Sequence, residues 1–239
     1  ATMESLLAYR FTEGHLKGQS FGNLFLAALN GMSDTFDEAV SKMSDVLAIT
    51  GRVLPVTNEN IYLVADFDDG SSVIGESKIS DFKRGTDKRI SKVRLTPENP
   101  PALPASVEAI DRADLIVLGP GSLYTSIIPN LLTDGVARSL ARSRAVKVLV
   151  LNIMTQDGET EGYSASEHVA AITDVVGEQI FDVCIANSAE IPKIFLDKYA
   201  AEGSAPVIVD TDTLMNMGLK LRSAPIVSWS SGKIRHDPC

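Results

Sequence analysis

The sequence predicts an α/β protein in three layers, with a mainly parallel sheet, helices on its faces and a small β-hairpin insertion. Apolar runs alternate with helical patterns through the second half of the chain, which is typical of a parallel sheet. The chain has 239 residues, of which 44% are hydrophobic and 22% charged. Because this length and composition are those of a soluble globular protein with a large core, we expect a single domain over residues 1–239.

The expected strands of the parallel sheet are apolar runs in the second half of the chain. The first run, Leu115–Leu118, has no polar residue, and we expect it to be buried on both faces of the sheet. The runs that follow are Val146–Leu151, Phe181–Ala186 and Val207–Val209. Together with the helices between them, these runs set the predicted fold class.

The helices between these strands have recognisable ends. Ser164 is a suitable N-cap, and Glu167 completes a capping box. Gly177 and Gly203 are placed where helices should terminate. The expected helices are Met3–Tyr9, Leu24–Asn30, Ala105–Arg112, Ile127–Ser143, Ser164–Val176 and Ile191–Ala201.

Residues 51–95 predict a β-rich insertion. Short β-rich runs flank Asp69 and Gly70, a dipeptide that favours a tight hairpin turn. The aspartates at 66, 68 and 69 resemble the start of a calcium loop, but the later ligands of such a loop are missing from the sequence. Turn chemistry is therefore the preferred interpretation. Four prolines between residues 97 and 104 then predict an irregular connector.

The Gly-Pro-Gly-Ser turn at residues 119–122 is the strongest candidate for a ligand site. Gly119 and Gly121 allow the backbone to turn sharply after the first strand. Backbone N–H groups there, with the positive end of the following helix dipole, would form a cradle for a phosphate or carboxylate. We therefore expect ligand contacts at Gly119, Gly121 and Ser122. An ordinary strand-to-helix turn is the alternative.

Two further strands also end in polar residues. Asn152 follows the second apolar run, and Asn187 follows the third. Ligands of open α/β sheets bind at the carboxyl ends of the strands, where these residues should lie beside the turn. An asparagine amide both donates and accepts, which suits a sugar, a base amide or a phosphate ester. Each amide could instead cap a helix or a turn.

The loop Thr155–Tyr163 gathers hydroxyl, amide and carboxylate groups directly after a buried strand. Such loops often carry function. We expect Glu159 to orient a hydroxyl or to hold a magnesium ion that bridges phosphates, and Thr155 and Thr160 to donate to phosphate oxygens. Gln156 belongs to the same predicted site. Solvated loop polarity is the alternative.

Several other classes of site fit less well. The residues 18–22 match the hydrolase pattern G-x-S-x-G, with Asp210 and His236 in suitable order, but the segment before Ser20 is not a buried strand. We prefer a loop that opens the helix after it, with ligand approach at Ser20, Gly22 and Asn23. The Gly119 turn lacks the third glycine of the dinucleotide fingerprint. No metal site is predicted, because the histidines at 15, 168 and 236 have no i, i+4 pairing.

The net charge and the cysteine content limit which partners and which cellular compartment the sequence favours. The formal net charge of −9 argues against nucleic acid and against an anionic membrane as partners. The sequence has no apolar run long enough to span a bilayer and no signal-peptide pattern. The two cysteines, Cys184 and Cys239, suit a reducing cytoplasm. Because Ala1 opens directly into a helical pattern, we expect that an N-terminal piece is missing. A homodimer is the default assembly for such folds.

Taken together, the motifs resemble one family over almost the whole chain, from about Leu6 to His236. They are residues 18–24, residues 113–131 around Gly-Pro-Gly-Ser, residues 152–160, and Glu167 with His168. The family comprises the 2-phospho-L-lactate transferases and the related gluconeogenesis factors. The pairing of residues 125–130 with the loop at 152–160, and residues 51–55 before the hairpin, resemble the gluconeogenesis-factor branch.

This resemblance implies a Rossmann-like fold in a bacterial, cytoplasmic protein that binds a nucleotide-type small molecule. The regulatory branch is associated with NAD-like or UDP-sugar ligands, carbon metabolism and control of cell shape. The transferase branch moves a phospholactyl group from a guanylylated donor to a deazaflavin with the help of magnesium. Family members also carry an N-terminal glycine-rich turn and an aspartate-rich loop, which this sequence lacks. The residues themselves identify no side chain that is clearly poised as a catalytic base.

Overall fold

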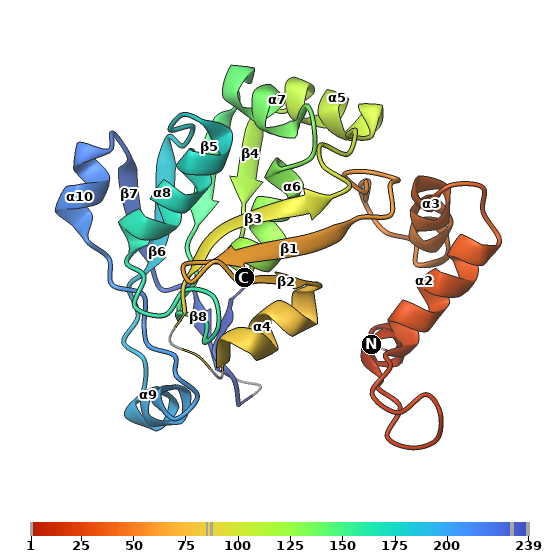
Figure 1. Cartoon of the computed structure of the whole chain (residues 1–239), viewed down its shortest axis with the longest axis horizontal. Coiled ribbons are helices and arrows are strands. Elements are labelled where there is room, and N and C mark those ends of the chain that lie inside the picture. Colours follow the sequence, from red (N-terminus) through yellow and green to blue (C-terminus); the bar gives the residue numbers. More distant parts are fainter. Residues whose placement is uncertain (1, 85, 87, 230–231, 238–239) are drawn as a thin grey trace. The chain divides into compact units, whose positions relative to one another are not determined.

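The computed structural model describes residues 2–84, 86, 88–229 and 232–237 (Figure 1). The chain divides into two compact units. The first contains Ala1–Glu59 with Ala102–Ser106, and the second contains Asn60–Pro101 with Val107–Cys239. Cys239, one of the two cysteines of the sequence, lies outside the described residues. Among the described helices, none is both long enough and apolar enough to cross a membrane.

The first unit is helical. Its helices are α1 (Thr2–Ala8), α2 (Phe21–Gly31) and α3 (Phe36–Val46), and α2 packs against both of the others. Helix α2 begins earlier than predicted, because the Ser20 hydroxyl accepts a hydrogen bond from the Asn23 N–H and thereby caps the helix. Thr35 caps α3 in the same way.

The second unit contains the predicted parallel sheet. Its strands are β4 (Leu115–Leu118), β5 (Val146–Val150), β6 (Val183–Asn187) and β7 (Lys220–Ala224), in that spatial order. All three pairings between neighbours are parallel. The α/β fold class predicted from the alternation of strands and helices is therefore confirmed.

Two strand predictions are wrong in detail. Val207–Val209 is not a strand of this sheet; its middle residue Ile208 forms an isolated bridge with Ser164, and the preceding Pro206 forms one with Met154. The fourth strand is β7, which sequence periodicity missed because Lys220, Arg222 and Ser223 interrupt its apolar pattern. Strand β4 is also not buried on both faces. Leu115 and Val117, which lie on one face of the strand, are 57% and 52% exposed, and Val146 beside Leu115 on β5 is 48% exposed.

Glycines shape the helices of the second unit. The predicted helix over 127–143 is instead divided into the π-helix η1 (Leu123–Ile127), α6 (Ile128–Leu131) and α7 (Val136–Arg142), with Gly135 between them at φ 94°. Helix α8 (Ala165–Val176) has the predicted capping box, and Gly177 ends it in the left-handed region. The remaining helices are α5 (Pro104–Arg112), which begins in the first unit, α9 (Lys193–Ala200) and α10 (Thr211–Asn216).

The insertion forms an antiparallel sheet with the order β2 (Ser72–Ile74), β1 (Tyr62–Phe67), β3 (Ile90–Thr96). The predicted hairpin at Asp69 and Gly70 is confirmed by the pairing of β1 with β2. Helix α4 (Glu76–Arg84) packs on this sheet, and α6 contacts β3. Two of the three aspartates of the rejected calcium loop form ion pairs, Asp66 with Arg94 and Asp69 with Lys88. A short antiparallel pair, β8 (Val227–Ser228) with β9 (Arg235–His236), completes the unit.

Candidate functional site

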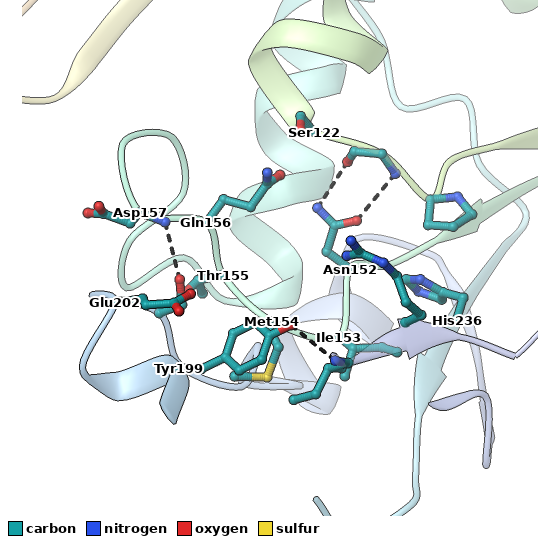
Figure 2. Close-up of a pocket in the computed structure, with 15 residues that line it drawn as sticks. Ser122, Asn152, Ile153, Met154, Thr155, Gln156, Asp157, Tyr199, Glu202 and His236 are labelled. Atoms are coloured by element: carbon teal, nitrogen blue, oxygen red, sulfur yellow. Dashed lines mark hydrogen bonds between the residues drawn. The ribbon is translucent and has the colours of Figure 1, made fainter. Parts of the chain in front are cut away.

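A pocket of about 680 Å³ lies at the carboxyl ends of β4 and β5, where the sequence predicted a site (Figure 2). One wall is the turn after β4 together with the loop after β5. A second wall comes from the segment at the end of α9 and from β9. The lining residues are Pro120, Gly121, Ser122, Asn152, Ile153, Met154, Thr155, Gln156, Asp157, Tyr199, Glu202, Ser204, Ile234, Arg235 and His236.

The turn requires glycine at one position only. Gly119 has φ +80°, and a Cβ there would lie 2.8 Å from the backbone oxygen of Val150. Only glycine tolerates both conditions. Gly121 has no positive φ, and a Cβ there would make ordinary contacts with Ser126 and Ile127. The two glycines of the motif therefore have different roles, and Gly121 leaves room for a small side chain.

Asn152 holds the turn in place. Its amide Nδ2 donates to the Gly121 oxygen at 2.9 Å, and its Oδ1 accepts from the Gly121 N–H at 3.3 Å (Figure 2). The N–H that the anion cradle would use at Gly121 is thus already bonded. The Asn152 amide acts on the backbone, which was the alternative to direct ligand recognition, although the residue does line the pocket.

Glu159 fixes the helix that follows the turn. The side chain is 6% exposed; Oε2 accepts from the Tyr124 N–H at 3.1 Å and Oε1 from the Thr125 hydroxyl at 2.7 Å. Burial raises the pKa of this carboxyl, while the hydrogen bonds from Thr125 and Tyr124 oppose that rise. Both oxygens accept hydrogen bonds from the protein's own groups, and Glu159 does not line the pocket. Its predicted part in orienting a ligand hydroxyl or holding magnesium stays a prediction.

The threonines of the loop also bond to the backbone. The N–H of Thr155 donates to the Ala205 oxygen at 2.7 Å, and its hydroxyl accepts from the Ala205 N–H at 2.9 Å. The hydroxyl of Thr160, a fully buried residue, accepts from the Gln156 N–H at 3.0 Å. Of the loop residues predicted as ligand contacts, Thr155 and Gln156 line the pocket, whereas Thr160 shapes the loop from inside.

Asn187 belongs to a separate, smaller pocket of about 240 Å³ at the ends of β5 and β6. Its amide donates to the Ala189 oxygen at 2.8 Å and accepts from the Ala189 N–H at 3.2 Å. This is the turn-capping alternative that its position after a strand also allowed. Asn152 lines both pockets, so the two cavities share the end of β5.

The second wall, formed by the end of α9 and by β9, was not predicted from the sequence. Glu202 lies next to Gly203, where a Cβ would approach the Asp157 carboxylate to 3.0 Å, so these two acidic side chains belong to one end of the pocket. Arg235 and His236 come from β9 and line the pocket, where Figure 2 labels His236. The Nε2 atom of His236 donates to the Leu151 oxygen at 2.9 Å. No motif marks these residues, because a two-residue strand brings them to the pocket from a distant part of the chain.

The predicted contacts Ser20, Gly22 and Asn23 lie in the first unit. Ser20 caps α2, and a Cβ on Gly22 would lie 3.0 Å from the Leu7 backbone oxygen. These residues therefore have structural roles within that unit. Gly22 and Asn23 lie inside α2 and not in a loop before it, which corrects the predicted helix start. Their part in ligand binding stays a prediction.

The polar groups of the rejected hydrolase triad are bonded elsewhere. Asp210 accepts hydrogen bonds from the hydroxyl and the N–H of Ser166, and His236 is bonded to a backbone oxygen. His168 is buried and its Nδ1 donates to the Ser164 oxygen; burial lowers the pKa of its imidazole. Within the described ranges, the structure has no cluster of three histidine, cysteine or acidic residues that could hold a metal ion.

The fold and the pocket define an α/β protein with a ligand site at the carboxyl edge of a parallel sheet. The family model of the 2-phospho-L-lactate transferase CofD matches residues 1–227. The chain belongs to this family. The predicted resemblance is therefore confirmed.

Relatives within the family place the chain more closely. The gluconeogenesis factor of Bacillus subtilis is 42% identical over 236 residues, which are 98% of this chain and 73% of that protein. A relative from Clostridium acetobutylicum is 46% identical over 235 residues, 98% of this chain, and this chain spans about half (52%) of its length. A crystal structure of a upf0052 family member from Bacillus halodurans has a TM-score of 0.92 and 42% identity, covering 99% of this chain and 75% of that one.

Proposed function

We propose that the protein is a regulator of the gluconeogenesis-factor type, which binds a nucleotide sugar or a dinucleotide in the 680 Å³ pocket without turning it over. In this proposal it acts in the bacterial cytoplasm as a homodimer, and ligand binding links carbon metabolism to cell shape. The names of relatives that match almost the whole chain support the proposal.

One structural observation carries it. The polar side chains of the first wall, such as Asn152 and Thr155, bond to the protein's own backbone. Glu159, which does not line the pocket, bonds to the first turn of η1. Groups engaged in this way build a fixed binding surface and are not poised to transfer protons. Arg235 adds a cation and Gln156 an amide to the lining, which suit phosphate and hydroxyl groups.

A second candidate is phospholactyl transfer to a deazaflavin with magnesium, which the description of the matching family favours. Such a reaction needs mainly positioning and charge neutralisation at phosphorus. A protein without a side-chain nucleophile in its pocket can therefore still catalyse it.

Thermal shifts of the 239-residue protein separate the two functions. The ligands are UDP-N-acetylglucosamine, NAD, GDP, and a deazaflavin with magnesium. Saturation at about 100 times Kd adds roughly 2.7 kcal/mol to the free energy of unfolding, which is a rise of several degrees. A rise with the nucleotide sugar or NAD alone supports the regulator. A rise confined to the deazaflavin or GDP, followed by phospholactyl transfer in an assay, contradicts it in favour of the transferase.

A further inference from the structure

A second cavity, of about 240 Å³, adjoins the pocket proposed to bind the nucleotide. Asn152 and Ile153 line both cavities, so the end of β5 is their common border. The smaller cavity is also lined by the end of β6 with the loop after it, by Leu196 of α9 and by three residues of the segment 206–209. A group attached to a ligand in the larger pocket therefore has only this two-residue border to pass to enter the smaller cavity.

Hydrogen bonds hold the walls of the smaller cavity in place. The Val207 N–H donates to the Ile153 oxygen at 3.0 Å and joins the segment 206–209 to the end of β5. The Asn187 amide fixes the loop after β6 through its two bonds to Ala189. A cavity bounded by segments joined in this way is formed before a ligand arrives, as most small-molecule sites are.

The lining of the smaller cavity is mainly apolar. Its apolar residues are Leu151, Ile153, Ala186, Ala189, Ile191, Leu196, Pro206, Val207 and Val209. Ile191, Leu196 and Val207 are only half-buried, so a ligand placed there removes further apolar surface from water. Among the described residues that line this cavity there is no lysine, arginine or histidine, and the one carboxylate, Glu190, belongs to an exposed residue. The cavity therefore favours an uncharged group.

The parts of a nucleotide sugar or a dinucleotide differ in the partners that they require. A phosphate needs positive charge, which Arg235 brings to the larger pocket and which the lining of the smaller cavity lacks. The hydroxyls of a sugar need several hydrogen-bonding partners, but the amides of Asn152 and Asn187 already bond to the backbone. A nucleobase has two apolar faces and polar atoms only at its edge, which suits an apolar cavity with few polar side chains.

We propose that the smaller cavity is the subsite for the base of the nucleotide, whose phosphates lie in the larger pocket. This inference rests on the proposed function. The base is an uncharged, flat ring, and its burial covers the half-buried apolar side chains of the smaller cavity. A nucleotide sugar and a dinucleotide each contain a base, so this subsite serves either ligand.

The test fills the smaller cavity with a side chain. Val207 lines it, whereas the next residue, Ile208, does not and is 68% exposed. Val207→Trp should occupy the space of the base and raise the Kd of UDP-N-acetylglucosamine about tenfold or more, measured by calorimetric titration. Ile208→Trp is the matched control, which adds the same ring one residue away and should change the Kd by less than about twofold. Equal effects of the two variants, or wild-type affinity in Val207→Trp, overturn the inference.

A second measurement needs no variant. In saturation-transfer difference NMR with the wild-type protein, the ring protons of uracil should receive more saturation than the protons of N-acetylglucosamine, because aliphatic side chains surround the base. Saturation of the sugar that equals or exceeds that of the base overturns the inference, even where Val207→Trp distorts the larger pocket or does not fold, and the proposed function stands. NAD, observed through its adenine protons, replaces the nucleotide sugar in both measurements if only NAD binds. Failure of both ligands to bind the wild-type protein overturns the proposed function and this inference together.

Discussion

The two walls of the pocket differ in how they are built. In the wall formed by the turn after β4 and the loop after β5, buried polar side chains bond to the backbone, as Asn152 does to Gly121. The wall formed by the end of α9 and by β9 also has polar side chains bonded to the backbone, Tyr199 and His236, but it adds exposed charged side chains, Glu202 and Arg235. Its support is a small apolar cluster that includes Ile153 and Ile234, with Tyr199 packed against it.

The two walls should therefore contribute differently to the free energy of unfolding and to ligand affinity. A substitution in the first wall leaves buried donors and acceptors unpaired, so it should cost free energy of unfolding as well as ligand affinity. A substitution of an exposed charge in the second wall should change affinity with little effect on stability.

The largest effect is expected for Gly119→Ala. The positive φ and the 2.8 Å approach of the new Cβ to the Val150 oxygen both oppose the native turn. We expect a loss of roughly 2–4 kcal/mol in the free energy of unfolding, measured by urea denaturation. Gly121→Ala is the control, because its Cβ meets Ser126 at 3.6 Å, and it should change stability by less than about 1 kcal/mol. Equal losses in the two variants contradict this account of the turn.

Asn152→Ala should affect both stability and binding. It leaves the Gly121 N–H and oxygen without their partner, which costs about 1–3 kcal/mol. The loosened turn should weaken nucleotide binding about tenfold or more, measured by calorimetric titration. Asn187→Ala is the control, because it removes the same kind of amide contact at Ala189. It measures how much free energy of unfolding such a contact contributes without a change at the turn. An Asn152 variant that keeps full stability but loses binding shows instead that this amide contacts the ligand directly.

Arg235→Ala should weaken binding without unfolding the protein. The side chain is exposed and lines the pocket, so we expect a stability change within about 0.5 kcal/mol. Loss of a charge-assisted contact to phosphate should raise Kd about tenfold. Lys233→Ala, two residues away and outside the lining, removes the same charge and should leave Kd near its wild-type value. Equal weakening by both variants means that the general potential, and not a contact, is responsible.

The smallest effect concerns the pH dependence of stability. Because burial raises the pKa of Glu159 in the folded state, the folded protein holds this proton at a higher pH than the unfolded chain does. Ionisation then favours the unfolded chain, so the wild type should lose stability relative to Glu159→Gln as pH rises above the ordinary value of 4.5. Urea denaturation of both proteins between about pH 4.5 and pH 8 measures the difference. A wild type that gains stability relative to Glu159→Gln as pH rises contradicts the direction of the shift.

A further check concerns the core of the sheet. Cys184 of β6 is fully buried, and burial raises the pKa of its thiol to about 12. In a Cys239→Ser background, a thiol reagent at pH 8 should label Cys184 only when the protein is unfolded in urea. Rapid labelling of the native protein would show that β6 opens readily.

The sequence predicted well what depends on neighbouring residues. The capping box of α8, the hairpin at Asp69 and the glycine at 177 all follow from local hydrogen bonds and backbone freedom, and the structure contains each of them. Strand β7 and the break in the helix at Gly135 were missed. β7 is stabilised by pairing with β6, and this tertiary contact overrides its weak apolar pattern.

The sequence by itself determined the fold class, the edge of the sheet where the pocket lies and the family. It did so because strand and helix periodicity and turn chemistry are local, and because the Gly-Pro-Gly-Ser motif is distinctive. Only the tertiary structure decided the role of each polar residue. Whether Asn152 or Glu159 meets a ligand or the backbone depends on partners 31 and 35 residues away, and Arg235 reaches the pocket through β9. No local pattern encodes such distant partners.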